Sequence, residues 1–185
     1  MSTVAAERPA APRLLLAALL GAGVAVALGV YGNVHDPSQK LSFTLFFSST
    51  LSMKVWLATF ALGFGVVQVL SALSLYGKLP FAAPSWIGGL HRISGRVAFL
   101  LSLPVAYHCL WSLGFQDTDT RVLAHSLLGC AFYGAFATKV TIVRSKGLPG
   151  VALPVAGGLL FALLVGAWYT SAGWFINDNG GFPDF

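Results

Sequence analysis

The sequence predicts an all-α integral membrane protein, a bundle of five transmembrane helices. Of the 185 residues, 56% are apolar and only 9% are charged, and the mean hydropathy is +0.77, which is far from the composition of a water-soluble domain. A helix needs roughly 20 mostly apolar residues to cross a bilayer. Five runs without Asp, Glu, Lys or Arg meet or approach this requirement: 14–35, 55–77, 97–116, 122–138 and 147–177. They are too long for barrel strands and do not alternate as such strands do.

The basic residues predict the orientation of these helices. Cytoplasmic loops of membrane proteins carry an excess of Lys and Arg. With the amino terminus in the cytoplasm, eight basic residues fall inside (Arg8, Arg13, Lys78, Arg92, Arg96, Lys139, Arg144 and Lys146) and three outside (Lys40, Lys54 and Arg121). We therefore expect a multi-pass protein of the cell membrane, the inner membrane of a bacterium, with its carboxyl terminus outside.

Three parts follow from this topology: a cytoplasmic tail over 1–13, a five-helix domain over 14–175, and an extracytoplasmic tail over 176–185. The first run resembles a secretory signal, because Arg13 precedes it and Ala25-Val26-Ala27 resembles a cleavage site. Its apolar stretch continues to Tyr31, however, so we expect the segment to be retained. The net charge of +5 is explained by inner-side anchoring and contact with anionic membrane lipid, and no nucleic-acid partner is expected.

Two of the four histidines are predicted to meet near the outer surface. His108 lies about 10 Å below the outer end of the third helix, and His125 lies about 7 Å below the outer start of the fourth, at 1.5 Å of rise per residue. Only a short loop, "QDTD", joins these helices, so we expect them to be antiparallel neighbours. A haem b with two axial histidines requires such a pair of imidazoles on facing helices.

Small residues near both histidines leave room for a flat macrocycle. Gly129 follows His125 by one helical turn, and Ala106 and Gly114 flank His108. The expected cofactor is therefore one haem b, with His108 and His125 as ligands of its iron. Two alternatives remain open at this point: the histidines form structural hydrogen bonds between helices, or they belong to a proton relay.

The runs "HRISG" at 91–95 and "HSLLG" at 125–129 carry a family resemblance. "AHSLLG" resembles a motif of the cytochrome b561 family, and "LHRISGR" resembles one of the ferric reductase-like membrane proteins. The whole chain is also similar to an actinobacterial family of five-helix membrane proteins without an assigned function. The resemblance to the haem families implies four histidine ligands and two haems. Here Lys139 stands where a further inner ligand is expected, so we predict one haem, with two as the alternative that the resemblance implies.

His91 then has three open interpretations: a residue beside a cofactor or quinone together with Arg92 and Arg96, an interfacial histidine without a role, or a ligand with an unusual partner. Arg92 and Arg96 are also candidates for holding anionic groups. A haem near the outer surface directs its propionates toward Arg121 or Lys54 instead.

Several other residues are candidates for smaller roles. Tyr107 and Tyr133 lie close enough in sequence to the histidines to orient an imidazole or to line a quinone pocket. Gln68 is predicted to form an interhelical hydrogen bond. Met53 is a weak alternative ligand, and we interpret Cys109 and Cys130 as packing residues.

The function expected from these observations is that of a b-type cytochrome. Such a protein carries single electrons between membrane quinol and an extracytoplasmic acceptor, as an electron-transfer protein or a subunit of a membrane oxidoreductase rather than a stand-alone enzyme. The alternative is a haem-free accessory subunit of a larger respiratory complex, with its contacts carried by the loop 33–53 and the tail 176–185. A transporter is a weaker alternative, because internal repeats and midplane charges are not visible.

Overall fold

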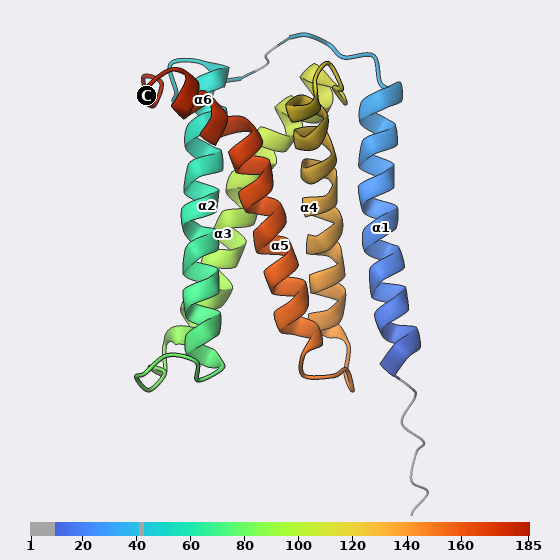
Figure 1. Ribbon diagram of the computed structural model, residues 1–185, viewed down its shortest axis with the longest axis vertical. Helices are drawn as coiled ribbons and strands as arrows, with labels where there is room; N and C mark the ends of the chain where they lie inside the picture. Colours follow the sequence, from blue (N-terminus) through green and yellow to red (C-terminus); the bar gives the residue numbers. More distant parts are fainter. Residues whose placement is uncertain (1–9, 41–42) are drawn as a thin grey trace, which may run out of the picture.

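The computed structural model describes residues 10–40 and 43–185. In these residues it contains helices and no strands (Figure 1). The helices are α1 (Ala10–Val34), α2 (Thr50–Leu75), α3 (Ile87–Tyr107), α4 (Thr120–Arg144), α5 (Ala152–Trp168) and the short α6 (Trp174–Asp178). Two π-helical turns, η1 (His108–Leu113) and η2 (Tyr169–Gly173), continue α3 and α5. The prediction of an all-α chain with five helices long and apolar enough to span a membrane is confirmed.

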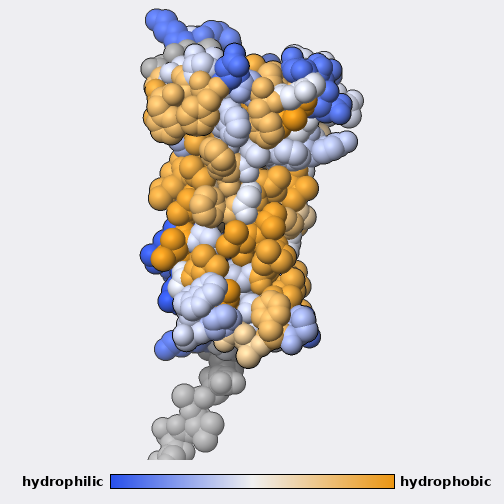
Figure 2. Space-filling model, turned by 90° about the vertical axis from the view of Figure 1, so that its left-hand side faces the viewer, coloured by the Kyte–Doolittle hydropathy of each residue, from blue (hydrophilic) through white to orange (hydrophobic). Residues whose placement is uncertain are grey.

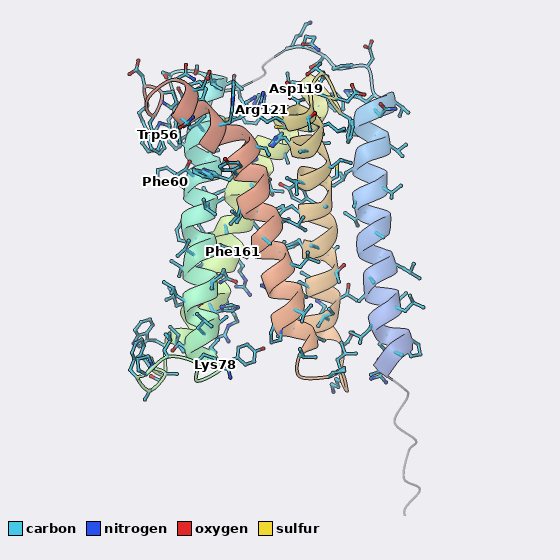
Figure 3. The ribbon with its side chains drawn as sticks, in the orientation of Figure 1. Trp56, Phe60, Lys78, Asp119, Arg121 and Phe161 are labelled. Carbon is cyan, nitrogen blue, oxygen red and sulfur yellow. The ribbon has the colours of Figure 1, made fainter. Side chains whose placement is uncertain are left out.

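Successive long helices run in opposite directions, so the bundle has two distinct ends (Figure 1). We call one the α6 end, which also carries the loop between α1 and α2. We call the other the Lys78 end, after the residue labelled there in Figure 3. Helices α1, α3 and α5 run toward the α6 end, and α2 and α4 run away from it.

Four helices, α1 to α4, begin earlier than the charge-free runs predict. Helix α3 begins at Ile87, ten residues before the predicted start, and it includes Arg92 and Arg96 on its exposed surface. Long basic side chains can extend along an apolar surface toward water, so they need not end a helix. Helix α2 begins at Thr50, where the Ser49 side chain accepts a hydrogen bond from the backbone N–H of Ser52. In the predicted 1–13 tail, residues 1–9 lie outside the described residues, and α1 begins at Ala10.

The closest packing pairs α2 with α3, and it places α1 and α5 against α4. The loop 114–119 joins α3 to α4 as predicted, but large aromatic side chains separate the two helices. The Phe99 and Phe136 rings stack between them with centroids 4.1 Å apart. The Tyr133 hydroxyl donates a hydrogen bond to the Ser102 hydroxyl at 2.9 Å. The sequence pattern could not predict this separation, because loop length limits only the distance between helix ends.

Helices α1 and α4 cross at glycines. A Cβ atom added to Gly21 would lie 2.5 Å from the Gly134 carbonyl oxygen, and one added to Gly134 would lie 2.5 Å from the Gly21 carbonyl oxygen. The Thr138 hydroxyl donates to the Ala17 carbonyl at 3.2 Å beside this crossing. Small residues allow such backbone approach between apolar helices, where packing rather than hydrophobic burial supplies most of the attraction.

We expect Gly21→Leu to destabilise the protein by about 1–3 kcal/mol, the usual cost of forcing extra carbon atoms into a packed interface. Gly23→Leu is the matched control, because an added Cβ at Gly23 meets no atom within 4 Å. Thermal unfolding in detergent should show a lower midpoint for Gly21→Leu only. Equal midpoints for the two variants would contradict the close α1–α4 crossing.

The surface of the bundle is apolar between its two ends. Figure 2 shows a broad hydrophobic band on the face toward the viewer, with hydrophilic groups concentrated near both ends. Large side chains are strongly exposed along several helices, including Leu16 at 56%, Leu100 at 61% and Leu159 at 55%. A water-soluble monomer rarely exposes so continuous an apolar surface, so this band has the character of a lipid-facing surface.

Candidate functional site

A cavity of about 310 Å³ lies near the α6 end, between α2, α3 with η1, α4, and η2 with α6. We call it the His125 cavity. Its walls are mainly apolar, and its polar side chains include Lys54, Cys109, Arg121, His125, Cys130 and Tyr133. Mainly apolar walls with a few polar groups are typical of small-molecule sites, and the volume lies at the lower end of their range of about 300–1,000 Å³.

Both π-helical turns contribute to this cavity. Cys109, Leu110 and Leu113 reach it from η1, and Ser171 and Ala172 reach it from η2. A π-helical turn widens the helix locally and is frequently found at functional sites. The coincidence of two such turns at one cavity indicates that its shape depends on departures from regular helix in two different segments.

The imidazole of His125 is held by α5 and η2. Its Nδ1 lies 3.1 Å from the Ala167 carbonyl oxygen and 3.3 Å from the Thr170 hydroxyl. Because a carbonyl oxygen can only accept, Nδ1 carries the proton and donates, which leaves a lone pair on Nε2 in the neutral ring. Within the described residues Nε2 has no hydrogen-bond partner. The cavity wall therefore carries an oriented nitrogen that can bind a metal ion or accept a hydrogen bond.

Open space lies on the same helix one turn beyond His125. A Cβ atom added to Gly129 would meet no atom within 4 Å, and Gly129 lines the cavity. The prediction that Gly129 leaves room beside His125 agrees with this geometry. Gly114 is needed for its backbone conformation, because its φ of +75° is one that glycine adopts readily. At the next residue, the Phe115 N–H donates a hydrogen bond to the Gly32 carbonyl at 2.7 Å.

Two cations line the cavity, and its described lining contains no carboxylate. The Arg121 guanidinium donates to the Thr170 carbonyl at 2.9 Å and lies 3.9 Å above the Trp174 ring. Its only ion pair within the described residues is a long one to Asp119, at 3.9 Å (both labelled in Figure 3). Lys54 has no ion pair within those residues. The cavity therefore favours a ligand that carries an anionic group.

The structure does not place His108 on this cavity. Its side chain is completely buried, and its ring lies 4.7 Å from the Phe43 ring, edge to face. His108 follows Leu101 by two helical turns and shares the face on which Leu101 and Val105 pack against the cluster of Phe47, Met53 and Leu57. Its imidazole is thus directed toward α2 and the α1–α2 loop rather than α4. The His125 cavity contains one of the two predicted axial histidines.

Both ring nitrogens of His108 lack a hydrogen-bond partner within the described residues. A buried polar group in this condition costs about 1–3 kcal/mol relative to a satisfied one. The alternative that the histidines form structural hydrogen bonds between helices therefore fits His125, which is bonded to Ala167 of α5, but not His108 within the described residues. Met53 is fully buried beside Phe47 and Leu57, as a packing residue would be.

The inner motif residue His91 takes part in a separate polar network at the Lys78 end. Its Nδ1 lies 2.8 Å from the Ser71 hydroxyl of α2. Gln68 donates to the Ser94 hydroxyl at 2.8 Å and to the His91 carbonyl, which confirms its predicted interhelical hydrogen bond. A Cβ atom at Gly95 would lie 2.8 Å from the Gln68 amide oxygen. In this chain the spacing of His91 and Gly95 thus fits the packing of α2 against α3.

Tyr133, like Arg121 and Lys54, lines the cavity, but three other predicted site residues lie outside it. Arg92 and Arg96 are exposed on α3 toward the Lys78 end, and Tyr107, which is 41% exposed, packs against the Phe43 ring. Cys109 and Cys130, which we interpreted as packing residues, both line the cavity. Ala167 and Thr170 orient His125 but were not predicted. A backbone carbonyl carries no sequence signature, so no signal in the chain could identify that contact.

The donor groups at the cavity limit the kind of metal it can hold. Within residues 10–40 and 43–185, no three His, Cys, Asp or Glu side chains gather into a set of ligands for a metal ion. A metal centre built on His125 therefore needs a group that brings most of its own ligands. A porphyrin, which supplies four ring nitrogens to its iron, is such a group.

The fold and the site define a class: the described residues form a helical bundle with five membrane-length helices and a partly open cavity near one end. The chain belongs to the family of unknown function DUF6529, which matches residues 14–182. No curated protein and no solved structure matches it.

Proposed function

We propose that this protein spans a membrane and carries electrons through one haem b bound in the His125 cavity. The observation that carries the proposal is the oriented His125 ring, whose Nδ1 donates to the Ala167 carbonyl and whose Nε2 has no hydrogen-bond partner among the described residues. Metal-binding histidines commonly donate a hydrogen bond from the second ring N–H to a carbonyl or carboxylate, which fixes the tautomer and raises the basicity of the ligating nitrogen.

The orientation we propose places the α6 end on the extracytoplasmic side. Seven described basic residues belong to the half of the bundle nearer the Lys78 end: Arg13, Lys78, Arg92, Arg96, Lys139, Arg144 and Lys146. Lys40, Lys54 and Arg121 belong to the other half. The excess of basic residues agrees with a cytoplasmic Lys78 end.

The residues around His125 fit a haem held by one histidine. His125 would bind the iron, the open space at Gly129 would accept part of the macrocycle, and Arg121 and Lys54 would hold its propionates. When bound, the haem supplies one-electron redox chemistry. The chain orients the imidazole through Ala167, surrounds the site with apolar side chains that limit water, and offers positive charge toward the α6 end. Membrane quinol as donor and an extracytoplasmic acceptor complete the proposed electron path.

A haem with two axial histidines would need the His108 imidazole on the same cavity as His125, but His108 faces α2. We therefore propose His125 as the single protein ligand of the iron. If His125 alone held the haem, we would expect a high-spin spectrum, whereas two histidine ligands would give a low-spin spectrum.

The test is an absorption spectrum of the full chain, purified in detergent from cells supplied with a haem precursor. We expect a reduced-minus-oxidised difference spectrum of b type and one haem per chain by extraction of the pigment. A colourless protein that also fails to bind added haemin contradicts the proposal. If that colourless protein copurifies in fixed ratio with a redox complex, the accessory-subunit alternative replaces it.

A further inference from the structure

The short helix α6 forms part of the wall of the His125 cavity and depends on other segments for its position. Trp174 and Phe175 of α6 line the cavity, next to Ser171 and Ala172 of η2. The backbone of α6 lies mainly against η2, the turn that directly precedes it in the chain. A helix of five residues makes too few internal hydrogen bonds to be stable by itself. Contacts of its side chains, and of the residues that follow it, must therefore hold α6 in place.

One such contact holds the beginning of α6 on the α4 side of the cavity. The Arg121 guanidinium of α4 lies 3.9 Å above the ring of Trp174, the first residue of α6. From there α6 extends toward the beginning of α2 (Figure 1). The contacts on the α2 side therefore decide whether α6 stays across this end of the cavity.

The segment 179–185, which follows α6, folds back on the beginning of α2 and supplies these contacts. Phe182 stacks on the Trp56 ring of α2, with centroids 4.6 Å apart (Trp56 is labelled in Figure 3). The Phe185 ring lies 4.7 Å from the ring of Phe47, which is itself buried, and 5.7 Å from the Trp56 ring. Aromatic side chains thus join the end of the segment to the α2 side of the bundle.

Two hydrogen bonds to the backbone fix the same segment. The Trp56 indole N–H donates to the Pro183 carbonyl at 3.2 Å, and the Ser48 hydroxyl donates to the Asp184 carbonyl at 2.9 Å. Gly180 has a φ of +70°, a conformation that glycine adopts readily and that lets the chain turn after α6. The path of the segment is therefore set by specific contacts with α2 and the loop before it.

These contacts can separate without unfolding the bundle, because they lie at its surface. Phe182 and Phe185 remain 48% and 58% exposed. Segments with few buried apolar contacts open locally at a small cost in free energy, while the packed helices stay folded. The segment 179–185 therefore combines specific attachment with the capacity to detach.

We propose that the segment 179–185 is a latch that holds α6 against α2 and restricts entry to the His125 cavity from the α6 end. When the latch detaches, Trp174 and Phe175 can move away from the cavity with the rest of α6, and molecules from the aqueous side can enter. The inference concerns access to the cavity and does not depend on which ligand the cavity binds.

The free thiols of Cys109 and Cys130 can report this access, because both residues line the cavity. The experiment uses the full chain in phospholipid nanodiscs, purified without added haem precursor, and a sulfonated maleimide, whose charge keeps it out of the lipid. Mass spectrometry follows the modification of each cysteine with time. In the unmodified protein we expect a slow reaction, because the reagent reaches the thiols only while the latch is detached.

The double variant Phe182→Ser/Phe185→Ser should react at least about tenfold faster, because it removes the rings that stack on Trp56 and Phe47. Phe81→Ser is the matched control: it alters a 61% exposed phenylalanine at the Lys78 end and should leave the rate unchanged. Phe185→Leu keeps an apolar side chain without the ring and should give a smaller increase. This single variant decides the question if the double variant does not fold.

Three results would overturn the latch: equal rates for the folded variants and the unmodified protein, the same acceleration in Phe81→Ser, or a fast reaction in the unmodified protein. The second would show a general loosening of the chain, and the third a cavity already open to water. The thiol reaction needs no haem, so a protein that binds none can still show the latch, and the two proposals fail in different experiments.

Discussion

The His125→Gly variant is expected to lose its haem, and added imidazole is expected to restore it. In the proposed site the Nε2 atom of His125 is the only protein ligand of the iron, so its removal leaves the macrocycle with contacts to apolar walls and two cations. We expect haem affinity to fall by at least about tenfold, equivalent to roughly 1.4 kcal/mol. Free imidazole can occupy the space of the deleted ring and bind the iron in its place. The measurement is haem content per chain with and without imidazole.

His108→Leu is the control that separates one axial histidine from two. If His125 alone binds the iron, this variant keeps its haem and its spectrum. Because both His108 ring nitrogens are buried without a hydrogen-bond partner among the described residues, an apolar side chain of similar size should leave thermal stability unchanged or raise it. Loss of haem from His108→Leu, together with a low-spin spectrum of the unmodified protein, would instead support the bis-histidine arrangement.

The sequence predicted the helices well because a membrane-length apolar run is a strong and local signal. Every charge-free run coincides with a helix, and Gln68 makes the predicted interhelical bond. The start of α3 was misplaced because the search for charge-free runs excluded Arg92 and Arg96 from the predicted helix. Both residues are exposed on the helix surface, where long basic side chains can extend toward water. Helix ends in such chains depend on where side chains point, which hydropathy alone does not report.

The site was predicted in part, and the failure has a physical cause. Depth along a helix follows from residue counting, so His108 and His125 were correctly placed toward the same end of the bundle. The direction in which each side chain points depends on which helices pack together. Leu101 and Val105 pack α3 against α2, which turns His108 away from α4. The η1 turn then continues α3 with a wider spacing that no sequence rule indicated.

The Gly129→Leu variant is expected to fold normally and to bind almost no haem. Gly129 lies one turn from His125, and an added Cβ there meets no atom within 4 Å, so a leucine side chain can enter the cavity without displacing backbone. It would occupy the space beside the Nε2 atom that the macrocycle needs. Filling an empty apolar space and replacing a helical glycine both favour the folded state, so we expect an unchanged or higher unfolding midpoint.

Gly158→Leu provides the matched control for this variant. Gly158 is an exposed glycine of α5 with no atom within 4 Å of an added Cβ, and it does not line the His125 cavity. Both variants gain the same side chain in a helix, so only occupation of the cavity distinguishes them. Full haem content in Gly129→Leu would place the cofactor elsewhere in the bundle. Loss of haem in Gly129→Leu alone would place the macrocycle in the His125 cavity.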